Sequence, residues 1–443
     1  MKRTRQAGRL ATGAAAIAAV GTLATGCGSR PAPQPRGAEV IRGVAAVEPA
    51  VSPRPYAAAD LAFGLDVLGA WCRQKPTQNI VLSPSSLASG LGMAYLGAGG
   101  STAAAMASVL HLPAARSGTG GSAAPGSATP GSIEAGLQAR SRALASLSGP
   151  GVSVAGSDRV WADPKLLPRR SYLDAVATGY GAGIGRVPLL SNPDQATKQI
   201  DAAIAAATRG HITHLLSAQA VQGSIFVLTD ALYMKARWAT PFSPGQTTTG
   251  SFLTAAGQRV QAHYLNGSEF NSASANGWTA VSLPYQGGKL SMTALLPPAP
   301  SSSQISSCPE ISTTTLAALT SELSAPGAGV SSLSLPEISL RTQADLMPLL
   351  TKLGMGVAFG GAADFSGMSL QAGSLGEVEH AATLRVDAAG TVASAATAVV
   401  VLPSSARVTG PPVVFNRPYL LLVSAASTGE PLFLARVANP EAS

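Results

Sequence analysis

The sequence predicts an α+β protein with large antiparallel sheets. Apolar residues recur at helical spacing mainly in the first half of the chain, whereas short apolar runs typical of strands dominate the second half. Of the 443 residues, 46% are hydrophobic and 12% are charged. A composition this apolar excludes a chain that is disordered over most of its length.

The individual elements follow from local patterns. The spacing over 58–72 predicts a helix, and a short strand over 79–83 ends at Pro84. The next helix, 86–96, contains two glycines and is expected to pack closely against a neighbour. A run of small and turn-forming residues over 116–132 is expected to be a flexible insertion. Further helices are expected at 101–110, 133–147, 172–177, 194–207, 316–323 and 343–353, and further strands at 223–232, 279–283, 290–296, 331–339 and 419–424.

The N-terminal segment indicates export. Four basic residues precede a weakly apolar run over 10–24, which has the length of a secretory h-region and is too short to span a membrane comfortably. The run ends in Ala24-Thr-Gly-Cys27, which resembles the lipobox of bacterial lipoproteins. We therefore expect a signal peptide with a lipobox over 1–27, lipidation of Cys27, and a cell-surface lipoprotein or extracellular protein. The alternative is a plain secretory signal in which Cys27 is incidental.

The segment 28–57 is rich in proline and is expected to be an extended tether that holds a body over 58–443 away from the membrane. Beyond Cys27 the chain has two cysteines, Cys72 and Cys308. Outside the cytoplasm they could form a disulfide, or they could be two buried thiols. The sequence leaves both readings open.

Several function classes lack their motifs. The net charge of +8 falls to about +4 without the four N-terminal basic residues, and few aromatic residues lie among the other basic ones, so no nucleic-acid partner is expected. The five histidines form no metal-binding spacing. The chain has no G-x-S-x-G elbow, dinucleotide fingerprint or P-loop. These absences predict a protein that is not an enzyme and needs no metal or cofactor.

A series of motifs, in order over about residues 58–440, resembles the serpin superfamily of serine protease inhibitors. The segments that carry the resemblance are Asn79-Ile-Val-Leu-Ser-Pro-Ser-Ser-Leu87, Met93-Ala-Tyr-Leu-Gly-Ala-Gly-Gly-Ser-Thr102, Thr229-Asp-Ala-Leu-Tyr-Met-Lys-Ala-Arg-Trp238, Asp364-Phe-Ser-Gly-Met368, Glu379-His380 up to Gly390-Thr391, Phe415-Asn-Arg-Pro-Tyr419 and Arg436-Val-Ala-Asn-Pro440.

The resemblance implies a fold of three β-sheets and about nine helices with an exposed reactive-centre loop over 388–412. It also implies a suicide inhibitor of serine proteases, with cysteine proteases as further targets. The protease cleaves the loop and forms an acyl-enzyme, and the loop then inserts into the central sheet and traps the protease. The partner is thus a target protease, the chain is expected to be a monomer, and the membrane is contacted only through the lipid anchor.

The loop sequence suits insertion. Residues 391–402 carry no charge, glycine or proline, and they follow the hinge glycine, Gly390. In the family register the inward side chains are all small or β-branched, as a strand that enters a packed sheet requires. They are Thr391, Ala393, Ala395, Thr397, Val399 and Val401. Composition alone would favour an ordinary buried strand, and the flanking motifs reverse that preference.

The position of the scissile bond depends on the end from which it is counted. Counting from Gly390 places it at Ser404–Ser405, whereas the distance back from Pro418 suits Arg407. We favour Ser404–Ser405, because the length of the inserting segment fixes the count from the hinge.

Five further residues take positions that control sheet opening in the family. Ser83, Ser86, Asp230 and His380 occupy the shutter, and Trp238 occupies the breach at the top of the sheet. Asp230 departs from the usual asparagine. A buried aspartate needs donors, and His380 could be protonated beside it. The alternative is that the cluster is only a packing device.

The sequence therefore leaves three functions to compare. The first is a protease inhibitor, the second is a non-inhibitory serpin that acts as a binding or carrier module, and the third is a lipoprotein hydrolase. The hinge lacks bulky, charged or proline residues, which favours the first over the second. The missing nucleophile motif disfavours the third.

Overall fold

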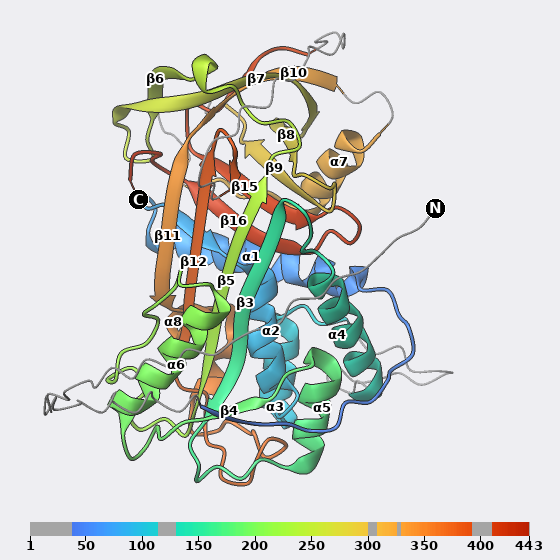
Figure 1. Ribbon diagram of the computed structural model, residues 1–443, viewed down its shortest axis with the longest axis vertical. Helices are drawn as coiled ribbons and strands as arrows, with labels where there is room; N and C mark the ends of the chain where they lie inside the picture. Colours follow the sequence, from blue (N-terminus) through green and yellow to red (C-terminus); the bar gives the residue numbers. More distant parts are fainter. Residues whose placement is uncertain (1–37, 114–129, 300–307, 326–328, 392–409, 443) are drawn as a thin grey trace, which may run out of the picture. The chain divides into compact units, whose positions relative to one another are not determined.

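The computed structural model describes residues 38–113, 130–299, 308–325, 329–391 and 410–442. Within them, α-helices and two β-sheets form the α+β fold that the sequence predicts (Figure 1). About nine helices were expected, and eight α-helices lie in these residues. They are α1 (Arg54–Gln74), α2 (Pro84–Tyr95), α3 (Gly100–Val109), α4 (Pro130–Ala145), α5 (Arg170–Tyr180), α6 (Pro193–Ala207), α7 (Thr313–Leu323) and α8 (Met347–Leu350).

The first sheet has seven strands and contains the long strands that run side by side in Figure 1. Its order is β1 (Glu39–Ile41), β4 (Ile184–Arg186), β3 (Val152–Ala162), β5 (Phe226–Arg237), β13 (Gly390–Thr391), β12 (Val378–Asp387) and β11 (Ile338–Asp345). Strands β3 and β5 are antiparallel along their whole length. Strands β5 and β12 pair in parallel over five residues each, and β13 lies between them at one end.

The second sheet has nine strands. Its order is β14 (Val413–Val414), β10 (Gly329–Pro336), β7 (Arg259–Ala275), β8 (Trp278–Pro284), β9 (Leu290–Leu296), β15 (Tyr419–Ala425), β16 (Pro431–Val437) and β2 (Ile80–Leu82), with β6 (Thr248–Leu253) beside β7. The long strand β7 pairs with β6 and β10 and, over its last four residues, with β8. Three sheets were expected, and the described residues form two, in one of which β7 joins β6 and β10 to β8.

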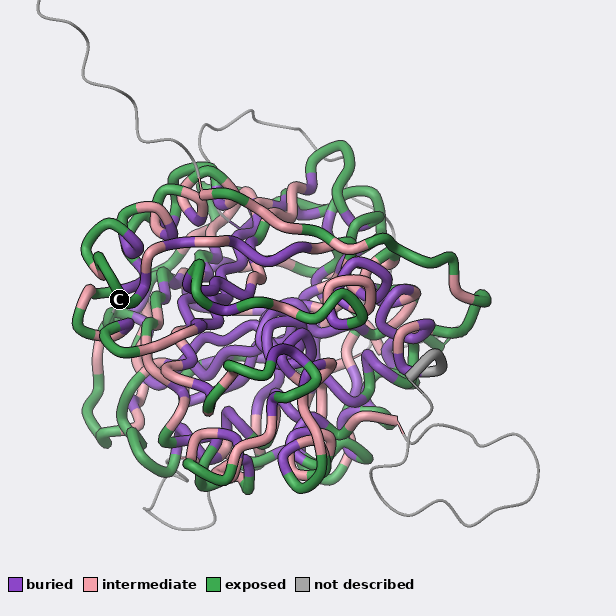
Figure 2. Tube along the Cα trace, turned by 90° about the horizontal axis from the view of Figure 1, so that it is seen from below, coloured by how far each residue is buried: buried purple, intermediate pink, exposed green. Residues whose placement is uncertain are grey.

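The core lies on both faces of the first sheet. One face packs against α1, α2 and α3, and the other packs against α6 through residues such as Trp161, Val227 and Ile200. A further apolar cluster fills the space between the two sheets. Buried residues accordingly gather in the interior, with exposed ones around them (Figure 2).

Cys72 and Cys308 form a disulfide, with their Cα atoms 5.7 Å apart. The bond joins the end of α1 to the segment that precedes α7. This settles the alternative that the sequence left open in favour of pairing.

The expected tether over 28–57 is wrong for its described part, from residue 38 onward. Strand β1 pairs with β4 at the sheet edge, and α1 already begins at Arg54. Between them the chain is held along the body: the Ala46 amide donates to Thr178 Oγ1 at 2.9 Å, and its carbonyl accepts from Gln138 Nε2 at 2.8 Å. An open strand edge is a template for another strand, so this segment docks despite its prolines. Residues 28–37 lie outside the described part.

Two other expectations fail in the second half. The helix expected at 343–353 starts only at Met347, because residues 343–345 continue β11 and pair with β12. The single strand expected at 331–339 is divided at Glu337 into β10 and β11, which belong to different sheets. The insertion expected at 116–132 lies outside the described residues up to 129, and α4 begins at Pro130.

Candidate functional site

The hinge lies in the first sheet, between β5 and β12. Thr391 is paired with Ala236 on one side and Val386 on the other, so β13 already forms the start of an intervening strand. A turn precedes it, in which Asp387 Oδ1 accepts hydrogen bonds from the amides of Ala389 and Gly390 at 3.0 and 3.2 Å. Gly390 has φ of 156°, and a Cβ there would lie 2.1 Å from the Ala236 carbonyl oxygen. Glycine is therefore required at this position.

Thr391 points into the core, as the family register predicts. Its side chain is buried, and its hydroxyl lies 2.6 Å from the hydroxyl of Tyr285. Tyr285 stacks on Trp238, with ring centroids 4.5 Å apart, and Trp238 Nε1 donates to the Asp387 carbonyl at 2.9 Å. Trp238, the residue expected at the breach, thus contacts the hinge through Tyr285, which sequence reasoning missed. Tyr285 directly follows β8, and no motif singled it out.

The four expected shutter residues come together beneath the hinge. Residues alternate between the two faces of a sheet, so Asp230 and His380 face α2 while the alanines that follow them face α6. His380 Nδ1 lies 3.1 Å from Asp230 Oδ2, and the two residues are cross-strand partners. Ser83 caps α2 by accepting from the Ser86 amide at 3.3 Å, which places both serines at the sheet.

The contacts of His380 define its protonation. The Ser83 amide donates to Nε2 at 3.4 Å, so Nε2 is an acceptor and the hydrogen lies on Nδ1. In this tautomer Nδ1 donates to Asp230 Oδ2, whereas the protonated form that the sequence allowed would carry a hydrogen on both ring nitrogens.

A fifth residue, Asp158, belongs to the same cluster and was missed. It lies on β3 directly opposite Asp230, and Ser86 Oγ makes short contacts with a carboxyl oxygen of each. Burial, reinforced by the Asp230 charge, raises the pKa of Asp158 to about 8. Asp158 also lines a cavity of about 250 Å³ between β3 and helices α2, α4 and α5. No strand was expected at 152–162, so the sequence alone could not bring Asp158 to the shutter.

A buried guanidinium lies next to the shutter. Arg140 on α4 forms ion pairs with Asp60 on α1 and with Glu430, the latter at 3.0 Å. It also donates to Ser89 Oγ at 2.9 Å and to the Ser85 carbonyl, both on α2. Burial holds the pKa of Asp60 well above its usual range against the opposing effect of Arg140. The arrangement fixes the helices that support Ser83 and Ser86.

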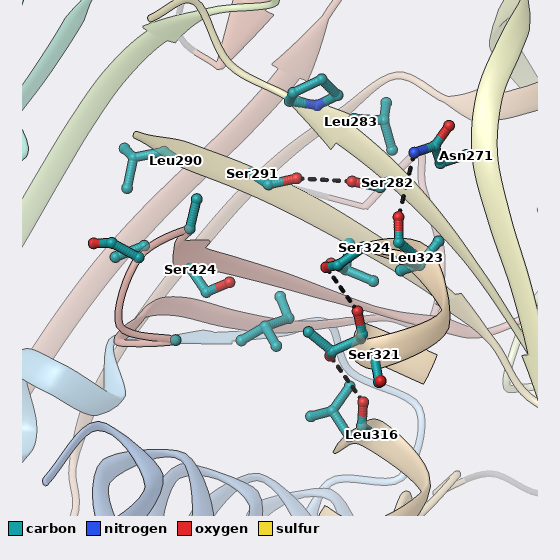
Figure 3. A pocket seen from close by; sticks show the side chains of 18 of the residues that line it. Asn271, Ser282, Leu283, Leu290, Ser291, Leu316, Ser321, Leu323, Ser324 and Ser424 are labelled. Atoms are coloured by element: carbon teal, nitrogen blue, oxygen red, sulfur yellow. Dashed lines mark hydrogen bonds between the residues drawn. The ribbon is translucent and has the colours of Figure 1, made fainter. Parts of the chain in front are cut away.

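A second candidate site is a cavity of about 1210 Å³ over the face of β8, β9 and β15, between α7 and the start of α1 (Figure 3). Leucine side chains and many hydroxyls line it, among them Ser282 and Ser291, whose oxygens are 3.0 Å apart. Asn271 Nδ2 donates to the Leu323 carbonyl at 3.3 Å. Arg54 and Glu269 are its charged residues. The lining suits an apolar ligand that carries a few hydrogen-bonding groups.

The remaining expected site residues cannot be placed. Ala393, Ala395, Ser404, Ser405, Arg407 and the lipidation residue Cys27 lie outside the described part of the chain. Among described residues, no group of three or more histidine, cysteine, aspartate or glutamate side chains is arranged to hold a metal ion. In the same part of the chain, no helix combines the length and apolar character needed to cross a membrane.

Comparison with known proteins gives a consistent result. Residues 58–440 match the family model described as Serpin (serine protease inhibitor). The chain is 32% identical over 301 residues to the putative serpin-Z12 of Oryza sativa subsp. japonica, covering 63% of this chain and 70% of that protein. It is 29% identical to the plasma serine protease inhibitor of Bos taurus, covering 89% and 93% of the two chains. A solved complex of thyroxine-binding globulin with thyroxine shares the fold, with a TM-score of 0.70, 24% identity and coverage of 87% and 99%.

Proposed function

Because the chain belongs to the serpin family, we propose that it is a suicide inhibitor of serine proteases, with cysteine proteases as further targets, and not an enzyme. The protease nucleophile attacks the carbonyl of the scissile bond in the loop, the new amine leaves, and the loop becomes an acyl group on the protease. The loop then enters the first sheet as a new strand before water hydrolyses the ester or thioester.

The observation that carries this proposal is the hinge at Gly390–Thr391. It is already hydrogen-bonded to both β5 and β12, and Thr391 is the first inward residue of the inserting register. Further insertion must separate the five direct pairs between β5 and β12, which include Asp230 with His380. The small residues Ala393 and Ala395 would follow Thr391 into the opened space.

We place the scissile bond at Ser404–Ser405, with Arg407 as the alternative. The position of the hinge supports counting from Gly390, because strand pairing defines where the inserted segment begins. Cleavage after Arg407 would instead indicate a trypsin-like target. Mass spectrometry of the released C-terminal fragment distinguishes the two sites.

A second candidate function is a binding or carrier role, which the large cavity under α7 favours. A solved relative is described as a complex of thyroxine-binding globulin with thyroxine, which gives this role a precedent within the same fold. In this chain the hinge supports the inhibitor role independently. A protein that binds small molecules without forming protease complexes would reverse our preference.

The test is incubation of the purified protein with a panel of serine and cysteine proteases. We expect a complex that survives denaturing electrophoresis, because the acyl bond is covalent. Each protease with its nucleophile replaced by alanine serves as the matched control and should form no such complex. Loop cleavage without any stable complex, for every protease that cleaves, would contradict the inhibitor role.

We further propose that residues 1–27 are a signal peptide with a lipobox and that the protein acts as a monomer outside the cytoplasm, lipidated at Cys27 or shed. The basic and apolar regions of this segment and the residues before Cys27 support the proposal. The disulfide fits an oxidising compartment.

A further inference from the structure

We propose that Asp158 is a further positioning residue of the shutter, which holds a proton between β3 and β5 and thereby sets how readily the sheet opens. The part of this proposal that concerns loop entry depends on the inhibitor function proposed above. The part that concerns the proton depends only on the geometry of the uncut protein.

The Ser86 hydroxyl has one hydrogen for two neighbouring carboxyl oxygens. Ser86 Oγ carries one hydrogen and lies within hydrogen-bond distance of Asp158 Oδ1 and of Asp230 Oδ1. The hydroxyl can donate to one of these oxygens, so the other carboxyl must donate its own hydrogen to Ser86 Oγ. If both carboxyls were ionised, two lone pairs would face each other at a short contact.

Of the two carboxyls, that of Asp158 carries the proton and that of Asp230 is ionised. Asp230 Oδ2 already accepts the Nδ1 hydrogen of neutral His380, which stabilises a negative charge on Asp230. Asp158 has no imidazole partner, and burial together with the Asp230 charge outweighs the hydrogen bonds of Ser86 and Ser89 and the charge of Arg140, which favour its ionised form. It also lines the 250 Å³ cavity through which a proton can be exchanged. The hydrogen bonds therefore run from Asp158 to Ser86, from Ser86 to Asp230 and from His380 to Asp230. The raised pKa of Asp158, about 8, agrees with this assignment.

Charged and titratable groups from several elements surround Asp158 and Asp230. Arg140 from α4 forms ion pairs with Asp60 from α1 and with Glu430 from the turn before β16, and it favours ionised Asp158 only as a lesser cause. Tyr180 from α5 stays protonated, since burial raises its pKa. Arg159 lies over the ring of Trp161, on the face of the sheet opposite to Asp158. Glu379 precedes His380 on β12, so its side chain lies on the opposite face of the sheet from that of His380. Burial and the Asp230 charge therefore outweigh Arg140 and disfavour a second negative charge at Asp158.

Sheet opening changes the surroundings of Asp230 but leaves Asp158 beside it. A strand that enters between β5 and β12 separates Asp230 from His380, because these two residues pair directly across that boundary. The β3–β5 ladder holds Asp158 opposite Asp230. Asp230 then loses one of its donors while Asp158 remains beside it, so the open sheet binds the shared proton more tightly than the closed sheet does. Opening should therefore become slower as the pH rises.

The experiment follows insertion of a synthetic peptide with the sequence of residues 391–402 into the uncut full-length protein. Between about pH 6.5 and about pH 9.5, the insertion rate of the natural chain should fall by about tenfold to a hundredfold, the equivalent of one charge-assisted hydrogen bond. In Asp158→Asn the amide still donates to Ser86 but cannot ionise, so the rate should be independent of pH when Glu379, whose own pKa is raised to about 7, is replaced by glutamine in every protein compared. Asp66→Asn, which removes a half-exposed carboxylate on α1, is the matched control and should retain the natural profile.

A second measurement does not depend on loop entry. The infrared band of a protonated carboxyl should be present in the uncut protein at about pH 6.5, weaken as the pH rises through the pKa of Asp158, and lose intensity in Asp158→Asn. Asp230→Asn, which also removes the carboxyl pair, provides a second variant with an expected flat profile if Asp158→Asn does not fold.

The outcomes separate this inference from the proposed function. An unchanged infrared band in Asp158→Asn, or an unchanged pH profile of insertion, overturns the role of Asp158 even if protease complexes form. Loss of the band together with a flat insertion profile supports it. If no protease is trapped but the band and the profile behave as expected, the inhibitor function fails and the protonated Asp158 stands.

Discussion

Thr391 is the residue on which the proposed mechanism depends most directly. Its buried hydroxyl contacts Tyr285, and its backbone already belongs to the sheet. In Thr391→Arg, a guanidinium would have no partner at this site already in the uncut protein, at a cost of several kcal/mol, so β13 should leave the sheet and its return should oppose insertion. We expect insertion to slow while the scissile bond stays accessible, so that hydrolysis of the acyl-enzyme overtakes trapping.

The measurement for Thr391→Arg is the number of inhibitor molecules consumed per protease inactivated. It should rise many-fold above that of the natural chain, with cleaved product accumulating. Thr391→Ser keeps the hydroxyl and the small size, so it should behave as the natural chain does. Stoichiometric trapping by the arginine variant would mean that the register is wrong or that the loop does not act by insertion.

Glu379 gives a separate pH prediction. Burial, with Asp345 opposite it on β11 as a lesser cause, raises the pKa of Glu379 to about 7. The folded state thus binds this proton more tightly than the unfolded state, and stability falls as the pH rises from the unfolded pKa toward 7. Glu379→Gln should therefore increase the free energy of unfolding at about pH 8 and leave it unchanged at about pH 4.

Urea denaturation of both proteins at the two pH values measures this effect. Asp174→Asn, which replaces a partly exposed carboxylate on α5, is the control variant. Equal stabilisation by Glu379→Gln at both pH values would point to packing rather than to the ionised carboxylate.

At the scale of elements, the disulfide joins α1 to the segment before α7, two parts that are 236 residues apart in the chain. Closing so long a loop restricts the unfolded chain. Replacing both Cys72 and Cys308 by serine should lower the free energy of unfolding by about 2–4 kcal/mol. Chemical denaturation of the double variant should match that of the natural chain under reducing conditions and fall below that of the oxidised chain. Identical stability in all three cases would show that the bond contributes nothing.

The elements also show where sequence patterns are informative. Helices α1, α2 and α6 have clear apolar spacing and were predicted near their observed positions. Strand β3 was not, because its middle, Gly156 to Arg159, is small or polar and gives no apolar run. It is held by eleven cross-strand pairs with β5 instead. Missing β3 also hid Asp158, since a residue with no assigned strand cannot be matched to Asp230.

The expected shutter was found from motifs rather than from spacing. Ser83 and Ser86 come from the start of α2, whereas Asp230 and His380 come from two strands that are far apart in the sequence. No periodicity could bring these residues together. Tyr285 shows the limit of the motifs as well: its contact with Thr391 depends on the breach geometry at Trp238, which only the fold defines.

At the scale of the whole molecule, the proposed anchor can be tested apart from inhibition. Cys27→Ala removes the thiol that acylation requires and should move the protein from the membrane fraction to the soluble fraction. Protease trapping should be unchanged, because the hinge and the shutter lie in the body that begins by residue 38. Retention of the variant on the membrane would contradict the lipobox.

A further strand can enter the first sheet between β5 and β12 only if these two strands separate. Over 228–232 and 378–382, β5 and β12 pair with each other, and only Gly390–Thr391 separates them farther along. Insertion of the loop replaces those few direct pairs by two longer ladders, one on each side of the new strand, and it buries valines at about 25 cal/mol per Å² of apolar area. Cleavage in the loop should therefore raise the melting temperature.

Limited proteolysis with a protease that nicks the loop, followed by calorimetry, measures this change. The natural chain should melt at a clearly higher temperature after the cut than before it. Thr391→Arg should gain less, because its guanidinium opposes the return of β13 to the sheet whether or not a protease is attached. Equal melting temperatures before and after cleavage of the natural chain would mean that the cut loop stays outside the sheet, and a trapping mechanism driven by insertion would then lack its source of free energy.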